Sequence, residues 1–333
     1  MEYVNLGTTG LRVSQVILGC GNFGGIGSAP EFYGQGETEE EAFAIMDRAF
    51  EMGINVFDTA DAYGGGRSET AIGRWLDSRG NGVRDQVLVS SKVFNPVGDG
   101  PNDWGLSRRH IRRQVVASLE RLGTDHLDLY LIHEPDPTTP LDVTLSALDD
   151  LVHSGAVHYV GASNVDATLV RDSLVVSRER SLEPFRWIQN SYSLLERGDE
   201  SQVLPICADE GLGYTPFSPL GGGLLTSKYS LDGDYPEGSR MTKRPEPYLQ
   251  HWNELTFDRL RRLGELATEK GVSSGGLALS WVMSHPHVTA PIVGPRHLGH
   301  FDAVEEALSL GLSPAERDEI TEVFDERGVT DGS

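Results

Sequence analysis

Short apolar runs alternate with amphipathic stretches along almost the whole chain, and this alternation constrains the fold more than any other feature. Eight of the runs are short and carry apolar or β-branched residues on both faces, as expected of parallel strands that are covered on both faces. They span residues 16–19, 55–58, 87–90, 127–132, 157–161, 187–190, 213–215 and 289–293. Eight strand-then-helix units predict a closed (β/α)₈ barrel, the TIM-barrel class of α/β fold.

Between and after these runs, apolar residues recur three and four positions apart, which is typical of helices packed on a core. The expected helices span residues 38–52, 107–122, 140–153, 165–176, 257–270, 274–284 and 313–327. Residues 3–7 and 11–14 flank Thr8-Thr9-Gly10 and predict a hairpin. We therefore expect one domain over residues 1–333, a barrel with an N-terminal β-hairpin and two extra helices. The long aperiodic stretch 220–249 is expected to be a binding loop or lid.

The charge balance limits the partners. The net charge of −22, from 50 acidic and 28 basic residues, repels phosphates, so nucleic acids and anionic membranes are not expected partners. Cys20 and Cys207 stand far apart without the spacing of a metal site or a disulfide framework, so no metal is expected. No signal peptide or apolar stretch of about 18 residues is apparent, and a cytoplasmic location is predicted.

Polar side chains end three consecutive predicted strands, where the active sites of such barrels lie. Asp58 ends the second strand, Lys92 the third and His133 the fourth, and Tyr63 follows Asp58 by five positions. Each has an ordinary interpretation: a turn cap for Asp58, a solvated end for Lys92, a turn residue for His133, and packing for Tyr63. Because three adjacent strands present these groups at equivalent depth, we interpret them as one site.

Such a set suits the reduction of a carbonyl group. Hydride addition leaves negative charge on the carbonyl oxygen, and an acid must protonate it. Tyr63 is a weak acid, with a reference pKa of about 10, and a neighbouring Lys92 ammonium favours its phenolate. Asp58 can compensate the burial of Lys92. His133 can donate a hydrogen bond to the carbonyl oxygen.

With these residues in this order, the chain resembles the aldo-keto reductases, whose tetrad of Asp, Tyr, Lys and His matches Asp58, Tyr63, Lys92 and His133. The resemblance runs from Leu6-Gly7-Thr8-Thr9-Gly10-Leu11 to Val293-Gly294-Pro295-Arg296, and Asp128-Leu129-Tyr130-Leu131-Ile132-His133 and Gly161-Ala162-Ser163-Asn164 are its most specific segments. The segment from His133 to Pro140 is similar to the branch that holds potassium-channel β subunits and bacterial glyceraldehyde-phosphate reductase-like enzymes.

The resemblance implies a nicotinamide cofactor, NADPH, with NADH as the alternative. For the carboxamide and the face of the nicotinamide ring it implies Ser163, Asn164, Gln189 and Tyr214, although Asn164 could instead cap a helix. For the phosphates it implies Ser218, Leu220, Lys228, Gly294 and Arg296. His300 and Val304 stand where relatives often carry Gln and Asn at the adenosine, which leaves the choice between the two cofactors open.

Gly19-Cys20-Gly21-Asn22-Phe23-Gly24 formally reads as the glycine fingerprint of dinucleotide-binding folds. That fingerprint needs a helix at the glycines and an acidic residue about twenty positions on. Here a loop continues to Gly36, so we interpret the segment as a loop on the substrate side. Asn22, Phe23 and Trp104 are the predicted walls of the substrate site.

Two other functions are compatible with these residues. A Schiff-base barrel lyase would use Lys92 as its nucleophile, but would leave Gln189, Lys228 and Arg296 without a role. A redox-sensing partner protein would hold NADPH with little turnover. The sequence does not specify which small carbonyl compound is the substrate, or the oligomeric state.

Overall fold

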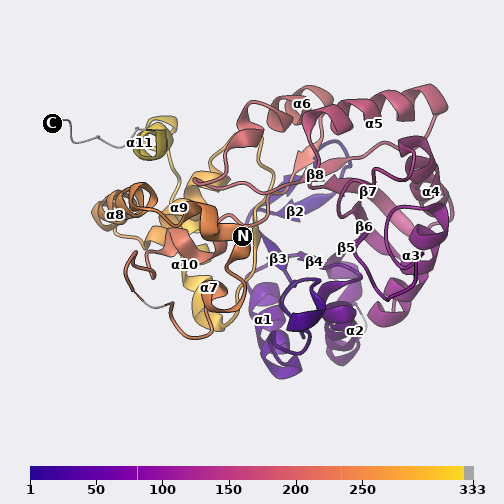
Figure 1. The fold of residues 1–333 in the computed structure, drawn as a ribbon, viewed down its shortest axis with the longest axis horizontal. Coiled ribbons are helices and arrows are strands. Elements are labelled where there is room, and N and C mark those ends of the chain that lie inside the picture. The colour runs from indigo at the N-terminus through magenta and orange to yellow at the C-terminus, as the bar shows by residue number, and fades with distance from the viewer. Residues whose placement is uncertain (81, 234, 326–333) are drawn as a thin grey trace.

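A computed structural model describes residues 1–80, 82–233 and 235–325 of the chain. Eight parallel strands pair in the order β10-β3-β4-β5-β6-β7-β8-β9, and the helices surround them (Figure 1). The strands are β3 (Ile17–Gly19), β4 (Val56–Asp58), β5 (Leu88–Val93), β6 (Leu127–Ile132), β7 (Val157–Ser163), β8 (Trp187–Gln189), β9 (Gly213–Tyr214) and β10 (Ile292–Val293). The sheet closes on itself because Thr289 and Ile292 donate backbone hydrogen bonds to the carbonyls of Tyr214 and Pro216. The predicted barrel is confirmed.

All eight predicted strands occur, and five of them are shorter than expected, β10 most of all. β9 stops before Pro216, and β10 starts only after Pro291, instead of at residue 289. Proline has no backbone N–H for a ladder, so it confines regular pairing to the residues beside it. The predicted hairpin is also present, with β1 (Tyr3–Asn5) antiparallel to β2 (Arg12–Ser14).

The predicted helices occur within a few residues of their expected bounds. They are α1 (Glu39–Glu51), α3 (Arg108–Leu122), α4 (Leu141–His153), α5 (Ala167–Arg180), α8 (Glu254–Glu269), α9 (Ser274–Met283) and α11 (Pro314–Asp325). Thr38 and Glu41 form a capping box at the start of α1, which satisfies backbone donors of its first turn. The last two residues of the predicted tail helix, 326 and 327, lie outside the described residues. The two extra helices are α8 and α11, which pack against each other beside the barrel (Figure 1).

Four helices were not expected from the sequence: α2 (Arg67–Arg79), α6 (Val203–Glu210), α7 (Arg240–Lys243) and α10 (Asp302–Ser309). α2 begins directly after Gly64, Gly65 and Gly66, all of which have positive φ. A glycine run of this kind indicates a loop when read locally, but here it turns the chain sharply into the helix.

Side chains alternate between two apolar cores. Inside the barrel, residues such as Val56, Leu129, Leu131 and Trp187 pack together, and Leu6 of the hairpin segment joins them. The other face of each strand packs on the helices and forms the larger core. Since the hairpin covers the N-terminal end of the barrel, the C-terminal end is the one left for a cleft. Among the described residues, no helix combines the length and the apolar character needed to cross a membrane.

Candidate active site

A cleft of about 1250 Å³ lies at the C-terminal ends of the strands. The residues that line it come from loops after nearly every strand. Among the predicted site residues they include Asn22, Asp58, Tyr63, His133, Ser163, Asn164, Gln189, Ser218, Leu220, Lys228, Gly294, Arg296 and His300. Residues far apart in the sequence therefore share one cavity, of the size that cofactor sites require.

Lys92 and Asp58 form a buried ion pair at the base of this cleft. The Nζ of Lys92 lies 2.6 Å from Oδ2 of Asp58 and donates a second hydrogen bond, of 2.8 Å, to the carbonyl of Thr59. The other carboxylate oxygen of Asp58 accepts hydrogen bonds from Ser90 and Gln189. Both oxygens of the carboxylate are thus partnered, as a buried charge requires.

Tyr63 and His133 meet above this pair. The hydroxyl oxygen of Tyr63 lies 3.4 Å from Nε2 of His133, and the two rings pack edge to face. The ammonium of Lys92 lies 5.2 Å from the centre of the Tyr63 ring. The four predicted residues therefore form one contiguous cluster of phenol, imidazole, ammonium and carboxylate.

Burial and charge set the protonation of the cluster. Burial raises the pKa of Tyr63, and the Lys92 ammonium counteracts part of that rise. Burial by itself would lower the pKa of Lys92, but Asp58 and Tyr63 together outweigh it, and the net pKa of Lys92 is raised. Burial, reinforced by Lys92, holds the pKa of His133 well below its usual value. At neutral pH the cluster therefore holds a phenol, a neutral imidazole and an ammonium.

Asn95 is a site residue that the sequence analysis missed. Its Nδ2 lies 2.9 Å from Nδ1 of His133, and the residue lines the cleft. An amide that donates to Nδ1 leaves the ring proton on Nε2, which faces Tyr63. Asn95 follows Lys92 by three positions at the end of the same strand, and that position is the signal that could have identified it.

The predicted carboxamide-binding residues lie together. Ser163 ends β7, Gln189 ends β8, and Asn164 donates hydrogen bonds to the carbonyl of His133 and to the hydroxyl of Ser163. Asn164 has a φ of 55°, the left-handed conformation that Asn tolerates. It is not the cap of α5, since Asp166 accepts the capping hydrogen bond from Leu169. The side-chain amide of Asn164 therefore does not cap the helix, and the residue lines the cleft.

The chain after β9 forms a glycine-rich loop beside several cations. Gly221, Gly222 and Gly223 all have positive φ. A Cβ on Gly222 would lie 2.5 Å from the Tyr248 ring, and one on Gly223 would lie 2.7 Å from Nζ of Lys228. Only glycine fits this close approach. Burial, reinforced by Arg296, lowers the pKa of Lys228, so an anion beside it would be favourable.

Comparison with known proteins decides the family. The model of the aldo/keto reductase family matches residues 15–325. The chain belongs to the aldo/keto reductase family. It is 39% identical over 320 residues to the uncharacterized oxidoreductase YrpG of Bacillus subtilis, covering 94% of this chain and 92% of the relative. It is 33% identical over 356 residues to the versiconal hemiacetal acetate reductase of Aspergillus parasiticus, covering 100% and 99%. It is also 37% identical over 298 residues to a probable voltage-gated potassium channel subunit beta of Oryza sativa, covering 88% and 87%.

These matches confirm the predicted family and its resemblance to channel β subunits. The protein is thus an NAD(P)H-dependent aldo-keto reductase, an enzyme class that reduces carbonyl groups of small molecules.

One predicted cofactor residue of this reductase does not face the cleft. Tyr214 is fully buried, packs against Tyr192, and donates its hydroxyl to Asp199. Phe217, three positions later, lines the cleft instead. The prediction that Tyr214 stacks on the nicotinamide does not fit this placement, because side chains alternate along the strand. Gly213 and Thr215 share the inward face with Phe217, and Tyr214 points outward.

Two predicted substrate residues also lie elsewhere. Phe23 is 1% exposed and belongs to the core between strands and helices. Trp104 is 41% exposed and packs edge to face on Phe94, outside the residues that line the cleft. Neither side chain lines the cleft, and their role as walls of the substrate site stays a prediction. Asn22 does line the cleft, as expected.

Arg296 also lines the cleft, and three other residues of the reductase form hydrogen bonds with it. Its Nε lies 2.6 Å from Oε1 of the buried Glu37, its Nη1 donates to the carbonyl of Gly238, and its backbone N–H donates to Nδ1 of His300. Burial and the neighbouring His297, Lys228 and Arg296 lower the pKa of His300 to about 4. At neutral pH, His300 is therefore uncharged, and its Nδ1 accepts the hydrogen bond from the backbone N–H of Arg296.

Two further cations of this cleft were missed, Arg240 of α7 and Arg244 just after it. The Nε of Arg240 is buried without a hydrogen-bond partner among the described residues. Both residues fall in the long loop that the sequence marked as aperiodic. The sequence did contain a signal for them: two arginines close together in one loop are unusual in a chain with 28 basic and 50 acidic residues.

Proposed function

We propose that this reductase uses NADPH to convert an aldehyde or ketone to the alcohol, with Tyr63 as the acid that protonates the carbonyl oxygen. The observation that supports this most directly is the contiguous cluster of Asp58, Tyr63, Lys92 and His133 at the base of the cleft. A bound nicotinamide would supply the hydride. The protein would supply the proton and hold the carbonyl in place.

In this proposal, each residue has a distinct task. His133, neutral and protonated on Nε2, donates a hydrogen bond to the carbonyl oxygen and fixes its position next to the Tyr63 hydroxyl. As negative charge develops on that oxygen, Tyr63 transfers its proton. Lys92 stabilises the resulting phenolate. Asp58 keeps Lys92 protonated and in place.

The cleft has the groups that a dinucleotide requires. Ser163, Asn164 and Gln189 provide the donors and acceptors for a carboxamide, and Phe217 provides a ring beside them. Lys228, Arg240 and Arg296 would bind the phosphates. In the part of the chain that the structure describes, the Nε of Arg240 has no acceptor for its hydrogen bond. Three cations gathered in a chain of net charge −22 favour NADPH, with its additional 2′-phosphate, over NADH.

Substitution of Tyr63 tests the proposed acid. Tyr63→Phe should lower the rate of carbonyl reduction at least about a hundredfold, while NADPH binding, followed by fluorescence, stays within about twofold. Tyr3→Phe, on the exposed hairpin, is the matched control and should retain full activity. Retention of the wild-type rate by Tyr63→Phe would refute the proposal.

Substitution of Arg296 tests the cofactor. Arg296→Ala should weaken NADPH binding at least about tenfold more than NADH binding, because only NADPH carries the 2′-phosphate. Arg74→Ala, whose side chain is 63% exposed, is the control for the loss of one positive charge. An equal loss of affinity for both cofactors would exclude Arg296 from the 2′-phosphate site.

The lyase alternative is disfavoured by the placement of Lys92. Its Nζ donates to two acceptors, the side chain is 1% exposed, and its pKa is raised, so it is neither accessible nor deprotonated for attack on a carbonyl carbon. Borohydride in the presence of candidate substrates should trap no adduct on Lys92.

A cofactor-holding partner protein is the second candidate, and the relatives named as potassium channel β subunits favour it. A panel of aldehydes and ketones with NADPH and NADH separates the two functions. Tight NADPH binding without turnover on any member of the panel would favour the partner protein. For either function we propose a cytoplasmic location, which suits two cysteines that are both buried and free.

A further inference from the structure

A second cluster of imidazole and carboxylate side chains lies at the opposite end of the barrel from the cleft. His126 immediately precedes β6, Asp128 is the second residue of β6, and His158 is the second residue of β7. Positions 126 and 128 share one face of the strand, because side chains alternate. Leu127 pairs with Val157 and Leu129 with Tyr159, which makes Asp128 and His158 neighbours across the two strands. The register therefore gathers all three side chains at the N-terminal end of the wall.

The spacing within this cluster suits a shared ion better than direct contact. Oδ1 of Asp128 lies 3.8 Å from Nε2 of His126 and 3.7 Å from Nδ1 of His158, and the three atoms all lie within 4.8 Å of one another. Such distances are too long for hydrogen bonds. Two bonds of about 2.1 Å to one metal would span about 3.4 Å at the tetrahedral angle. The two distances between histidine nitrogen and Asp128 oxygen exceed this span by only a few tenths of an ångström.

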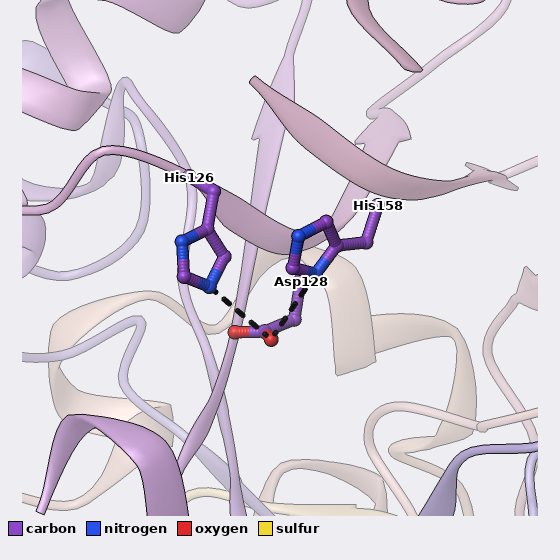
Figure 2. Close-up of side chains that lie close together, drawn as sticks. All are labelled: His126, Asp128 and His158. Atoms are coloured by element: carbon purple, nitrogen blue, oxygen red, sulfur yellow. Dashed lines mark ion pairs between the residues drawn. The ribbon is translucent and has the colours of Figure 1, made fainter. Parts of the chain in front are cut away.

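The orientation of each group also suits metal binding. Figure 2 shows one ring nitrogen of each histidine directed at the same carboxylate. The two rings are stacked, with centroids 4.4 Å apart and an interplanar angle of 25°. Nδ1 of His126 lies 2.7 Å from the carboxylate of Asp125. An Nδ1–H that donates to Asp125 leaves the lone pair of Nε2 pointing into the cluster, which is the arrangement usual for metal-bound histidines.

Asp128 is held from its other side. Its Oδ2 accepts a hydrogen bond of 2.8 Å from the backbone N–H of Val89 and lies 2.9 Å from Nη2 of Arg84. Arg84 also donates to the carbonyls of Val87 and His126, so its guanidinium is fixed away from Oδ1. The oxygen that faces the imidazoles takes no part in these contacts, and the carboxylate is already oriented.

The donor set also selects the kind of ion. Arg84 offsets part of the charge of Asp128, which disfavours hard cations such as Mg²⁺ and Ca²⁺ that bind through oxygen charge alone. Two imidazoles and one carboxylate suit Zn²⁺ and its neighbours, which bind nitrogen strongly. The histidine side chains are 27% and 47% exposed, so an ion and its remaining water ligands have access.

We propose that His126, Asp128 and His158 bind a divalent transition metal ion of the zinc class, and that this ion stabilises the barrel by joining the N-terminal ends of β6 and β7. The spacing of the two cysteines predicted no metal, and this cluster uses histidine and aspartate instead. The site is independent of carbonyl reduction, since it lies at the end of the barrel where residues contribute to stability.

Zinc titration of the full chain, by calorimetry near pH 7.5, tests the proposal. Wild type should bind Zn²⁺ at a site that His126→Ala and His158→Ala each weaken at least about tenfold. Zn²⁺ should also raise the melting temperature of wild type and not of these variants. His153→Ala removes another exposed histidine, beside Asp149, and should leave Zn²⁺ binding unchanged.

Two results would overturn the site: no Zn²⁺ binding to wild type at concentrations up to about 1 mM, or equal affinity in wild type and both variants. Both substituted histidines are partly exposed, so the variants are expected to fold. Equal melting temperatures of the metal-free proteins would establish that the comparison is valid. Asp128→Asn is a poorer test, because it also disturbs Arg84 and Val89.

Discussion

The Nζ of Lys92 lies 2.6 Å from Oδ2 of Asp58, and neither side chain is more than 6% exposed. Each charge in such a pair depends on the other, because an isolated charge in this environment would lack solvation. The pair therefore links the stability of the barrel to the chemistry proposed for Tyr63.

Removal of one member of this pair should damage both properties. Lys92→Met leaves the Asp58 carboxylate uncompensated, so the free energy of unfolding should fall by about 3–5 kcal/mol. The double variant Lys92→Met/Asp58→Asn should recover most of that loss and none of the activity. Urea denaturation and reduction rates measure the two effects. If the double variant is as unstable as the single one, the pair is not the source of the loss.

Asn95 should act as a positioning residue for His133. Asn95→Ala removes the amide beside Nδ1, so kcat should fall about ten- to a hundredfold while KM for the cofactor stays unchanged. Asn95→Asp should lower kcat further. A carboxylate accepts a hydrogen bond from Nδ1 and so favours the tautomer with its proton there, which leaves Nε2 without a proton to donate to the substrate. Steady-state rates across pH 6–9 measure this, and equal rates for both variants and wild type would remove Asn95 from the site.

Phe217 and Tyr214 should behave in opposite ways. Phe217→Ala removes the ring at the cleft, so cofactor affinity should fall about tenfold with little change in stability. Tyr214→Phe removes the hydrogen bond to Asp199 and should lower the free energy of unfolding by about 1 kcal/mol without changing cofactor affinity. Cofactor titration and urea denaturation of both variants test the assignment. The reverse outcome would restore Tyr214 as the stacking residue.

Asp61 should give the fold an unusual dependence on pH. Both of its carboxylate oxygens are buried without a hydrogen-bond partner among the described residues. Burial, reinforced by Glu69, raises its pKa well above 3.8. The folded state thus holds a proton that the unfolded state has released, so this contribution to stability is complete below pH 3.8 and is lost as the pH rises through the folded pKa.

Asp61→Asn stays neutral, so its free energy of unfolding should rise relative to wild type as the pH rises above about 4, by at most about 1.4 kcal/mol per pH unit. Asp209→Asn, at an exposed position, should show no such trend. Urea denaturation at pH 5, 6, 7 and 8 measures both variants. A difference between wild type and Asp61→Asn that stays constant over this range would show that Asp61 does not carry the raised pKa.

The sequence by itself determined the order of the eight barrel strands and of seven of the helices. A buried parallel strand is apolar on both faces, and the helix that follows it is amphipathic. Both patterns involve residues close together in the sequence, so they can be recognised without the structure. The proposed catalytic cluster was predictable for the same reason: Asp58, Lys92 and His133 end consecutive strands, and a parallel barrel brings such ends to one rim.

Only the tertiary structure decided which way individual side chains point and what lies beside them. Strand alternation turns Tyr214 outward into the core and Phe217 inward to the cleft. Asn95 and Arg240 line the cleft, and Glu37 contacts Arg296, because of chain paths that depend on contacts between distant segments. The same is true of His126, Asp128 and His158, which are brought together by the register between two strands, a property that emerges only when the barrel closes.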